Sequence, residues 1–537
     1  MSLCDIPHAM AVTGLTDGEL ADLNALLSVW WRKRERNVVR ERYYNAHNRL
    51  KDLGISIPPP LKRIETVVEW PEKAVDYIAD RAVLEGFTFR GMEENDELNE
   101  VMDENDFLAT YSQAVTDALI SSCAFLTVTK GVKGEPSVIV SAHSARDAAA
   151  IWDDRKKRIK CGLAVAEFDL DRDGRIKGAL RMNMFTDSCV LSLRKARNGR
   201  YVLERRAEHS QGAPLMEAIR CKPRLGRPFG KSRISRAVMS ISDSAVREAL
   251  RSEVSAEFFT APQKYILGAE DSIFDDKGKW EQYVGNWLAL TKDEEGDVPQ
   301  VGQFSQGNMQ SHSDYMRLLA ARFSGATGIP VSSLGVIHDN PSSAEAIYAS
   351  KEDAVVEAAN FNRANRSSLV RVAKLMLAVS RGKSVADLSD DEKTVRPRFM
   401  NPSMPSIVSQ SDAMVKQIDA IPWIGESRVA LEQLGYDETQ IMTLLSDKRK
   451  AESRALLQTQ QQQPDNSATM YEIASILKSF KSGKVTRKNA VALFARIGID
   501  ADEAEQMLDD ADDASETVDA VAGAVGGAGD DIAGAGV

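Results

Sequence analysis

The sequence predicts a helix-rich α+β protein, and three observations lead to this class. Residues 16–31 have apolar side chains at three- and four-residue steps, as in an amphipathic helix. From residue 124 to about residue 207 the apolar side chains instead alternate, in short segments separated by glycine-bearing turns, which is typical of antiparallel strands. After residue 231 the helical period returns. A β-rich segment inside a largely helical chain indicates the α+β class.

The size and composition are ordinary for a soluble globular protein with several packed domains. The chain has 537 residues, of which 43% are hydrophobic and 27% are charged. No window approaches the roughly 20 apolar residues of a membrane-spanning helix, and residues 1–15 lack the basic start and long apolar run of a signal peptide. The five cysteines are scattered without C-x-x-C spacing, so neither a disulfide framework nor a zinc site is expected, and a reducing compartment fits best. These features exclude membrane, secreted and fibrous classes.

The charge is unevenly distributed along the chain. The formal net charge is −11, and residues 501–537 contain eleven Asp and Glu and no Lys or Arg, so residues 1–500 sum to zero. The end of this acidic segment is rich in alanine and glycine, and we expect residues 514–537 to be flexible. Residues 31–49 and 218–242 are basic. Such segments suit contact with phosphates, with neighbouring subunits or with solvent, and charge alone does not choose among these.

The first half of the chain begins with helices and continues with strands. Thr16 and Glu19 have the spacing of a capping box, which starts a long helix. Residues 58–60 are three prolines and form a stiff linker. A second helix begins near Pro71, which suits a first-turn position, and Gly86 ends it. Residues 106–122 form a third helix. The strand pattern described above follows.

The second half contains two helices that bracket a small insert. Residues 232–258 and 309–324 have helical periodicity, and residues 263–308 between them are short and strand-like. Because so short an insert returns the chain to its starting point, we expect the two helices to be antiparallel neighbours.

A very long helix and a group of shorter ones complete the chain. Ser342 and Glu345 form a second capping box, and the helix that they start reaches about residue 380. Its middle, residues 360–368, is polar, and we expect a bend there. Further helices are predicted near residues 406–420, 426–434, 437–459, 467–481 and 486–509.

Two motif-like segments do not meet the chemical requirements of the sites that they resemble. Asp169–Ile176 looks like the start of a calcium-binding EF-hand loop, but the twelfth position is Leu180 instead of a bidentate glutamate, so a hairpin turn is predicted. Gly226–Ser232 looks like a phosphate loop, but it has one intervening residue too few and contains Pro228, which has no N–H for a phosphate. The six histidines have no metal-binding spacing. We therefore expect no catalytic site, metal or cofactor.

Five short segments carry a family resemblance: Arg42–Leu50, Val67–Phe87, Pro228–Ile234, Thr327–Gly335 and Asn340–Ile347. Together with the order of the elements, they closely resemble the portal proteins of tailed double-stranded DNA bacteriophages, in the branch found in siphophages. The similarity covers about residues 20–460, and the segment after residue 464 departs from it.

The resemblance implies an assembly and its partners. It implies a dodecameric ring at one capsid vertex of the virion, assembled in the host cytoplasm. Double-stranded DNA would be packaged and ejected through the central channel of this ring, with the terminase large subunit as the motor. The ring would later bind head–tail adaptor proteins, and it would contact the major capsid protein or a scaffold protein. The portal protein itself would not be an enzyme.

The resemblance also divides the chain into the parts of a portal protomer. Residues 1–230 and 328–400 would form the wing, which includes a tunnel loop at about 333–345 and a long bent helix at about 343–380. The other parts would be the stem at 231–262 and 305–326, the clip at 263–304, the crown at 401–463, a helical extension at 464–513 and the flexible acidic tail at 514–537.

Three groups of residues are candidates for function under this resemblance. The tunnel loop would approach the DNA with little fixed charge, through Val336, Ile337, His338, Asp339, Asn340 and Pro341. The stem would pack against neighbours or meet the channel through Arg233, Arg236, Ala245, Arg247 and Arg251, and the sequence leaves open which. The clip aromatics are either a surface for terminase and adaptor or the core of a small domain, and they are Trp280, Tyr283, Trp287 and Phe304.

Two other protein classes are alternatives. A packaging ATPase or nuclease would need a true phosphate loop or a carboxylate metal cluster, and the sequence has neither. Another DNA-binding scaffold protein of the virion would share the basic segments but remain monomeric. A channel suits residues 1–500 better, because a body with zero net charge does not hold DNA phosphates strongly.

Overall fold

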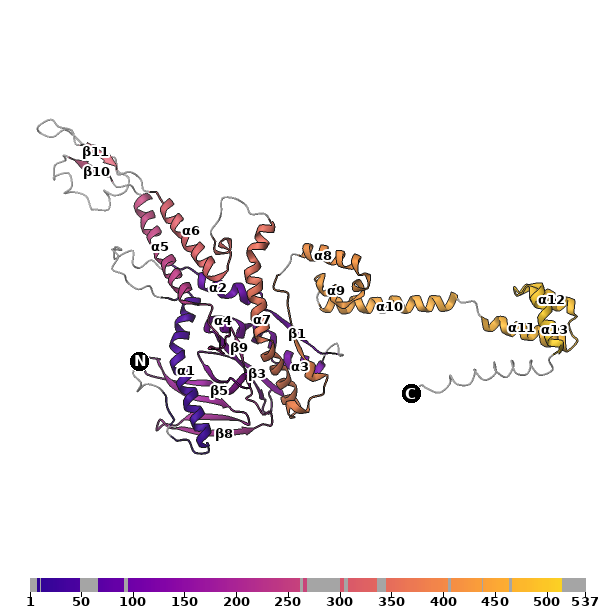
Figure 1. Ribbon diagram of the computed structural model, residues 1–537, viewed down its shortest axis with the longest axis horizontal. Coiled ribbons are helices and arrows are strands. Elements are labelled where there is room, and N and C mark those ends of the chain that lie inside the picture. The colour runs from indigo at the N-terminus through magenta and orange to yellow at the C-terminus, as the bar shows by residue number, and fades with distance from the viewer. Residues whose placement is uncertain are drawn as a thin grey trace. The chain divides into compact units, whose positions relative to one another are not determined.

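The computed structural model describes residues 7–9, 11–48, 66–90, 95–260, 264–267, 300–303, 308–335, 344–403, 407–436, 438–462 and 466–513 (Figure 1). The chain divides into two compact units, Met1–Met404 and Pro405–Val537. Within the described residues, every strand belongs to the first unit, and the second unit is helical. The predicted helix-rich α+β class is therefore confirmed.

The first helix, α1 (Asp17–Tyr44), begins at the predicted capping box. The Thr16 hydroxyl accepts a hydrogen bond from the Glu19 N–H at 3.3 Å, and the Glu19 carboxylate accepts one from the Thr16 N–H at 2.8 Å. Glu19 also forms an ion pair with Arg206 at 2.8 Å. The helix is fixed to a sheet by a buried apolar side made of Leu23, Leu26, Leu27 and Trp30.

That sheet is an antiparallel meander whose five strands lie in chain order. Its strands are β4 (Ala148–Asp153), β5 (Arg158–Leu170), β6 (Ile176–Phe185), β7 (Cys189–Lys195) and β8 (Tyr201–Glu208). The predicted hairpin turn between β5 and β6 is confirmed. Gly174 has a φ of +76°, and the Asp171 carboxylate accepts hydrogen bonds from the N–H groups of Asp173 (2.9 Å) and Arg175 (2.7 Å). The aspartate oxygens thus hold a turn together.

A three-stranded sheet lies at the centre of the first unit. In it, β2 (Cys123–Lys130) pairs antiparallel with β3 (Val138–Ser144) on one side and β9 (Met216–Arg220) on the other. The first six residues of β2 are all buried. This continuous burial arises because two helices, α4 (Phe107–Ser121) and α7 (Ala344–Ser380), both pack on this sheet.

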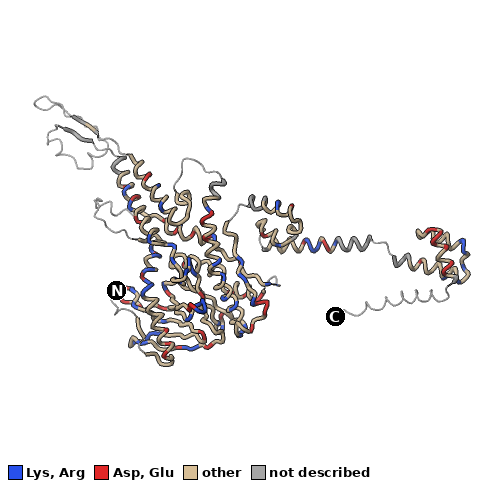
Figure 2. Tube along the Cα trace, in the orientation of Figure 1, with Lys and Arg blue, Asp and Glu red and all other residues tan. Residues whose placement is uncertain are grey.

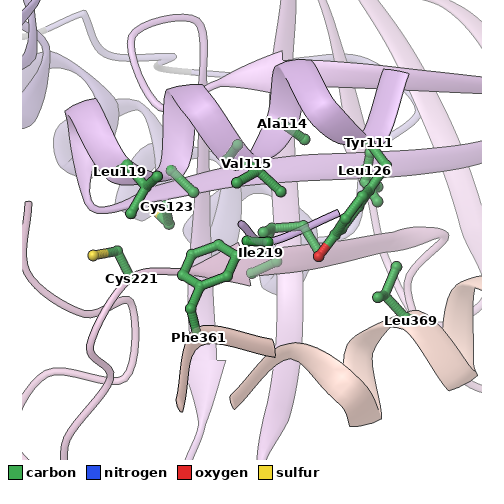
Figure 3. Close-up of a cluster of buried hydrophobic side chains, with 14 of the residues drawn as sticks. Tyr111, Ala114, Val115, Leu119, Cys123, Leu126, Ile219, Cys221, Phe361 and Leu369 are labelled. Atoms are coloured by element: carbon green, nitrogen blue, oxygen red, sulfur yellow. The ribbon is translucent and has the colours of Figure 1, made fainter. Parts of the chain in front are cut away.

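The packing of these helices on the sheet creates the main apolar core (Figure 3). The close-up shows side chains from three sources meeting there: Tyr111, Val115 and Leu119 of α4, Leu126 and Ile219 of the sheet, and Phe361 and Leu369 of α7. Residues far apart in the sequence therefore share one core, which fixes α7 to the sheet.

The long helix α7 is unbroken through the polar stretch where the sequence suggested a bend. Asn365 is fully buried there. Its side-chain oxygen accepts a hydrogen bond from the Arg220 N–H at 2.8 Å, and its amide nitrogen donates to the Arg220 carbonyl at 3.1 Å. Arg371 binds the buried Glu217 through two contacts of 2.5 and 2.8 Å. The polar residues of α7 thus dock it on β9, which lies at the edge of its sheet and offers unpaired backbone groups.

Four further elements of the first unit join residues that are distant in the sequence. They are α2 (Trp70–Ala79), α3 (Asp96–Glu104), β1 (Leu84–Thr88) and β12 (Arg396–Phe399). As predicted, Pro71 lies in the first turn of α2. The predicted end of this helix at Gly86 is wrong, because α2 ends at Ala79 and Gly86 lies in β1. The strands β1 and β12 pair antiparallel. The local pattern did not reveal this pair, because so short a strand is specified by its partner more than by its own sequence.

The two predicted bracketing helices are present and lie side by side (Figure 1). They are α5 (Arg236–Thr260) and α6 (Gln310–Thr327). The described ends of the insert, β10 (Lys264–Leu267) and β11 (Gln300–Gln303), pair antiparallel and bring the chain back on itself. The two helices are therefore antiparallel, as the short insert implied.

The second unit consists of α8 (Ile407–Ala420), α9 (Arg428–Gln433), α10 (Glu438–Gln462), α11 (Asn466–Lys481), α12 (Arg487–Arg496) and α13 (Ala501–Asp513). The prediction of one helix over residues 486–509 is wrong, because Gly498 takes a φ of +87° and separates α12 from α13. The helices α12 and α13 share a small core of Ala490, Phe494, Ala504 and Leu508, against which partly buried residues of α11 pack.

Tyr111 presents a testable feature of the main core. It is fully buried, burial raises the pKa of its phenol, and its hydroxyl has no hydrogen-bond partner among the described residues. An unpaired buried polar group costs about 1–3 kcal/mol. We therefore expect Tyr111→Phe to leave the free energy of unfolding unchanged or to raise it by about 1 kcal/mol, measured by chemical denaturation.

Tyr201→Phe is the matched control. Tyr201 is also buried, but its hydroxyl donates to the Ala179 carbonyl at 3.0 Å. Removing that donor should lower the free energy of unfolding by about 1 kcal/mol, because the carbonyl loses its partner. Equal destabilisation by both substitutions would contradict the assignment for Tyr111.

Candidate functional site

The base of the α5–α6 pair is held by a buried cluster centred on Arg233, just before α5. Its Nε donates to the Ala74 carbonyl of α2, and its Nη2 donates to the Thr327 carbonyl at the end of α6 at 2.7 Å. Its Nη1 binds the Glu357 carboxylate of α7, which Lys222 Nζ also binds at 2.8 Å. We define Arg233, Lys222 and Glu357, with the two carbonyls, as the Arg233 cluster.

The Arg233 cluster joins three helices through one cation. Only 3% of the Arg233 side chain is exposed, and a cation buried so deeply needs acceptors and a counter-charge. Burial favours the neutral form of Glu357, but Arg233 and Lys222 together outweigh it and lower the pKa of Glu357 below its ordinary value of 4.5. Glu357 is therefore ionised at neutral pH and balances the buried arginine.

Two adjacent tyrosines of α1 tie that helix to α5 and α2. The Tyr43 hydroxyl lies 3.0 Å from both carboxylate oxygens of Asp243 on α5, and Asn48 donates to the same carboxylate at 3.1 Å. The Tyr44 hydroxyl lies 3.0 Å from Asp76 Oδ1 on α2. Burial and the contact with Asp243 raise the pKa of Tyr43 to about 12, so its hydroxyl is the donor at neutral pH. These contacts fix α5 and α2 against the end of α1.

A buried carboxylate links α5 to α6 further along the pair. His312 Nδ1 of α6 lies 2.6 Å from Glu248 Oε1, and His312 Nε2 lies 3.0 Å from Ser255 Oγ. Arg251 Nη1 lies 3.5 Å from the other Glu248 oxygen, and only 5% of the Glu248 side chain is exposed. The two helices are thus joined by apolar packing where they reach the main apolar core, and by polar contacts closer to the insert.

Three of the five predicted stem residues reach the surface of the protomer. Arg236 is exposed at the first position of α5. Arg247 is half-buried and donates to Ser244 Oγ at 3.2 Å. Arg251 keeps 44% of its side chain exposed while it contacts Glu248. Their contact with a neighbour or with the channel stays a prediction.

The other two predicted stem residues, Arg233 and Ala245, lie inside the protomer. The Arg233 guanidinium is occupied by groups of its own chain, which corrects the expectation that it meets a neighbour or the channel. Ala245 is fully buried in the main apolar core, so its small side chain serves packing within the chain. Both side chains face the interior of the first unit. The helical period of residues 232–258 did not show which side of the helix is buried.

The other two groups of predicted site residues lie outside the described residues. These are Val336, Ile337, His338, Asp339, Asn340 and Pro341 of the tunnel loop, and Trp280, Tyr283, Trp287 and Phe304 of the clip. Before the predicted tunnel loop, the structure describes a 3-10 turn, η4 (Val331–Leu334), which ends at Gly335 with a φ of +79°. After it, α7 begins.

Several residues that hold this region together carry no local signal in the sequence. Glu357, Glu248 and Asp243 each bind a partner at least 60 positions away or in another element, so no local spacing marks them. Tyr315 and Leu318 fit the apolar period of α6, but they are 38% and 53% exposed. Their exposure indicates apolar surface on α6 that the described parts of the protomer do not cover.

The described parts of the chain contain no group of three or more His, Cys, Asp or Glu side chains placed to hold a metal ion. Nor does any helix within those parts have both the length and the apolar character to cross a membrane.

Comparisons with known proteins identify relatives of this chain. The portal protein of Mycobacterium phage L5 is 24% identical over 388 residues, and that of Mycobacterium phage D29 is 24% identical over 387 residues. Each alignment covers 70% of this chain and 77% of the relative.

Two solved structures are also similar to this chain. The neck of a native gene transfer agent particle, computed with C12 symmetry, has a TM-score of 0.38 and 15% identity, and the match covers 68% of this chain and 90% of that one. The virion of a native gene transfer agent particle has a TM-score of 0.38 and 12% identity, with 75% and 93% covered.

A family profile matches most of the chain. The profile is described as "Phage portal protein, SPP1 Gp6-like", and it matches residues 23–424. This range includes most of α1, both larger sheets, the α5–α6 pair, the Arg233 cluster and α7. The chain therefore belongs to the family of SPP1 Gp6-like phage portal proteins.

Proposed function

We propose that this portal protein assembles as a ring of identical copies, expected to be twelve, at one vertex of the capsid. Double-stranded DNA passes through the central channel of the ring during packaging and ejection. The observation that carries the proposal is the family match over residues 23–424, which spans the described elements from α1 to α8. Assembly takes place in the host cytoplasm, before the ring becomes part of the virion.

In the ring, α5 and α6 form the stem and pack against neighbouring subunits. The partly exposed Tyr315 and Leu318 lie one turn apart on α6 and supply apolar surface for this contact. Arg236, Arg247 and Arg251 of α5 either meet acids of a neighbour or line the channel.

The DNA and the protein partners meet other parts of the chain. The zero net charge of residues 1–500 suits passage of DNA, because phosphate contacts that release counterions would hold the duplex in place. Residues 336–341 form the tunnel loop that approaches the duplex. The terminase large subunit and then a head–tail adaptor bind the clip, and the major capsid or scaffold protein binds outside the channel. The terminase drives packaging, as the resemblance to portal proteins implies.

A charge placed on the exposed side of α6 tests this assembly. We expect Leu318→Glu to prevent ring formation while the protomer still folds, because the substitution puts a carboxylate into an interface that must be dry. Negative-stain electron microscopy and sedimentation would report the ring, and circular dichroism would report the folded protomer.

Leu170→Glu is the matched control, because Leu170 at the end of β5 is 55% exposed, close to the 53% of Leu318. This variant should form rings like the unmodified protein. If the unmodified protein were a monomer under all conditions, a monomeric scaffold protein would replace the portal proposal. If Leu318→Glu formed normal rings, the assignment of α6 to the interface would be wrong.

A further inference from the structure

Five cations line a pocket of about 320 Å³ in the first unit. Lys33, Arg36 and Arg40 come from α1, where Lys and Arg recur along the second half of the helix (Figure 2), and Arg227 and Lys231 come from the loop before α5. Among the described residues, no carboxylate lines this pocket, and none of the five cations forms an ion pair. We refer to it as the basic pocket.

The α1 side of the basic pocket is held in position by buried hydrogen bonds. Arg40 Nη1 donates to Asn37 Oδ1 at 3.2 Å and to the Ser121 carbonyl at 2.9 Å. The buried Asn37 in turn donates to the Ala145 carbonyl at 3.0 Å. The Arg40 guanidinium has five N–H groups, so these contacts fix it and leave further donors for a ligand.

The loop side is equally well fixed by its backbone. The N–H of Arg227 donates to the Arg224 carbonyl at 2.8 Å, and the N–H of Gly230 donates to the Arg227 carbonyl at 2.9 Å. The N–H of Lys231 donates to the Cys221 carbonyl at 2.7 Å. These bonds hold Arg227 and Lys231 at two defined positions of one tight loop.

An aromatic anchor between the two cations of the loop adds to this rigidity. The ring of Phe229 packs edge-on against Phe125 of β2 at 5.9 Å and against Trp152 of β4 at 5.7 Å. Phe229 therefore locks the loop to both sheets. The backbone that carries the two loop cations is therefore fixed before any ligand arrives, which lowers the entropy cost of binding.

No carboxylate of the described residues balances the positive charges in the basic pocket. Burial, followed by the charge of Arg36, lowers the pKa of Arg40 to about 10, and Arg227 lowers it further. Burial and the same neighbours lower the pKa of Lys33. When an anion binds among cations that repel one another, it relieves the repulsion and lowers the free energy.

We propose that the basic pocket binds a ligand with two or more linked phosphate groups. Three guanidinium groups suit this chemistry, since each can donate two parallel hydrogen bonds to phosphate oxygens, and the two lysines add charge. A single carboxylate would neutralise only one of the five cations. A volume of 320 Å³ lies at the lower end of ligand pockets, which span roughly 300–1,000 Å³.

This mode of binding differs from that of a nucleotide-binding phosphate loop. In the basic pocket the side chains of Arg227 and Lys231 act together with those of α1, and Pro228 between them has no N–H to offer. The linked phosphates can come from a nucleic-acid backbone or from a small oligophosphate. The pocket is complete within one chain, so the inference does not depend on the ring.

Calorimetry of the full chain with inorganic tripolyphosphate tests the inference. We expect saturable binding of one tripolyphosphate per protomer at low salt. Arg227→Glu and Arg36→Glu should each weaken it by at least about tenfold, because each removes a charge-assisted contact and adds repulsion. Arg172→Glu, a substitution of an exposed arginine in the β5–β6 turn, is the matched control and should bind within about twofold of the unmodified protein. The melting temperature of each variant shows whether it folds.

Competition distinguishes the two sources of phosphate. If a duplex oligonucleotide displaces tripolyphosphate and is itself weakened by Arg227→Glu, the pocket takes the nucleic-acid backbone. If it does not displace tripolyphosphate, the ligand is a small oligophosphate. Absence of tripolyphosphate binding, indifference of binding to both substitutions, or equally tight binding of polyglutamate would each overturn the proposal.

Discussion

Replacing Arg233 by methionine is expected to lower the free energy of unfolding of the Met1–Met404 unit by about 3–5 kcal/mol. The substitution leaves the Glu357 carboxylate in a buried site with only Lys222 as counter-charge. It also removes the donor from the carbonyls of Ala74 and Thr327, which then lose their hydrogen bonds. Chemical denaturation followed by tryptophan fluorescence measures the change.

Arg236→Met is the matched control, because Arg236 is exposed only three positions away. Its effect should stay within about 0.5 kcal/mol, as for most surface substitutions. A similar loss of stability in both variants would mean that the Arg233 cluster does not hold the base of the α5–α6 pair.

The pH dependence of stability gives an independent measure of the same cluster. Since the pKa of Glu357 is lowered in the folded protein, the ion pair stabilises the fold above the ordinary value of 4.5. This contribution is lost as the pH falls below 4.5 and through the lowered pKa. The stability difference between the unmodified protein and Glu357→Gln should therefore be largest near neutral pH and should shrink in acid.

Gly230→Ala is expected to lower the free energy of unfolding by about 2–4 kcal/mol. Gly230 has a φ of +78°, where a side chain is strained, and a Cβ there would lie 1.9 Å from the Cys221 carbonyl oxygen. That contact is with backbone, so the loop itself would have to move. The movement would displace Phe229 from its aromatic neighbours and would weaken tripolyphosphate binding together with stability.

Gly226→Ala, in the same loop, is the control for this substitution. A Cβ at Gly226 would meet nothing within 4 Å, and its φ lies outside the strained positive range. We expect its effect on stability to stay within about 0.5 kcal/mol. Thermal denaturation of both variants separates the two cases, and equal melting temperatures would contradict the tight approach at Gly230.

Local sequence patterns predicted the elements of this protein well. The capping box at Thr16, the turn at Asp171–Arg175 and the helices that bracket the insert all depend on contacts between residues close in the chain. The error at residues 486–509 arose because apolar residues keep a helical period across Gly498, and a period does not reveal a break at one left-handed residue.

The family resemblance to portal proteins also came from the sequence, since it depends on the order of the elements and on short motifs, and the family match confirms it. Within those motifs the structure supplies physical reasons. Tyr43 and Tyr44 tie α1 to α5 and α2, and Gly230 permits the tight loop before α5. The motifs thus mark points where separate elements are joined.

By itself, the sequence determined the class of the fold, the order of its helices and strands, and the family. All of these follow from the periodicity of apolar residues and from the spacing of residues in short motifs. Only the tertiary structure decided which charges are buried and which are left uncompensated. Arg233 and Arg227 stand six positions apart in one basic segment. Arg233 is enclosed with Glu357, whereas Arg227 lines a pocket that has no carboxylate among its described lining residues. The difference arises because α1, α2 and α7 are brought next to these residues only in the folded protein. The free energy of a charge depends on such neighbours and on the solvent that they exclude.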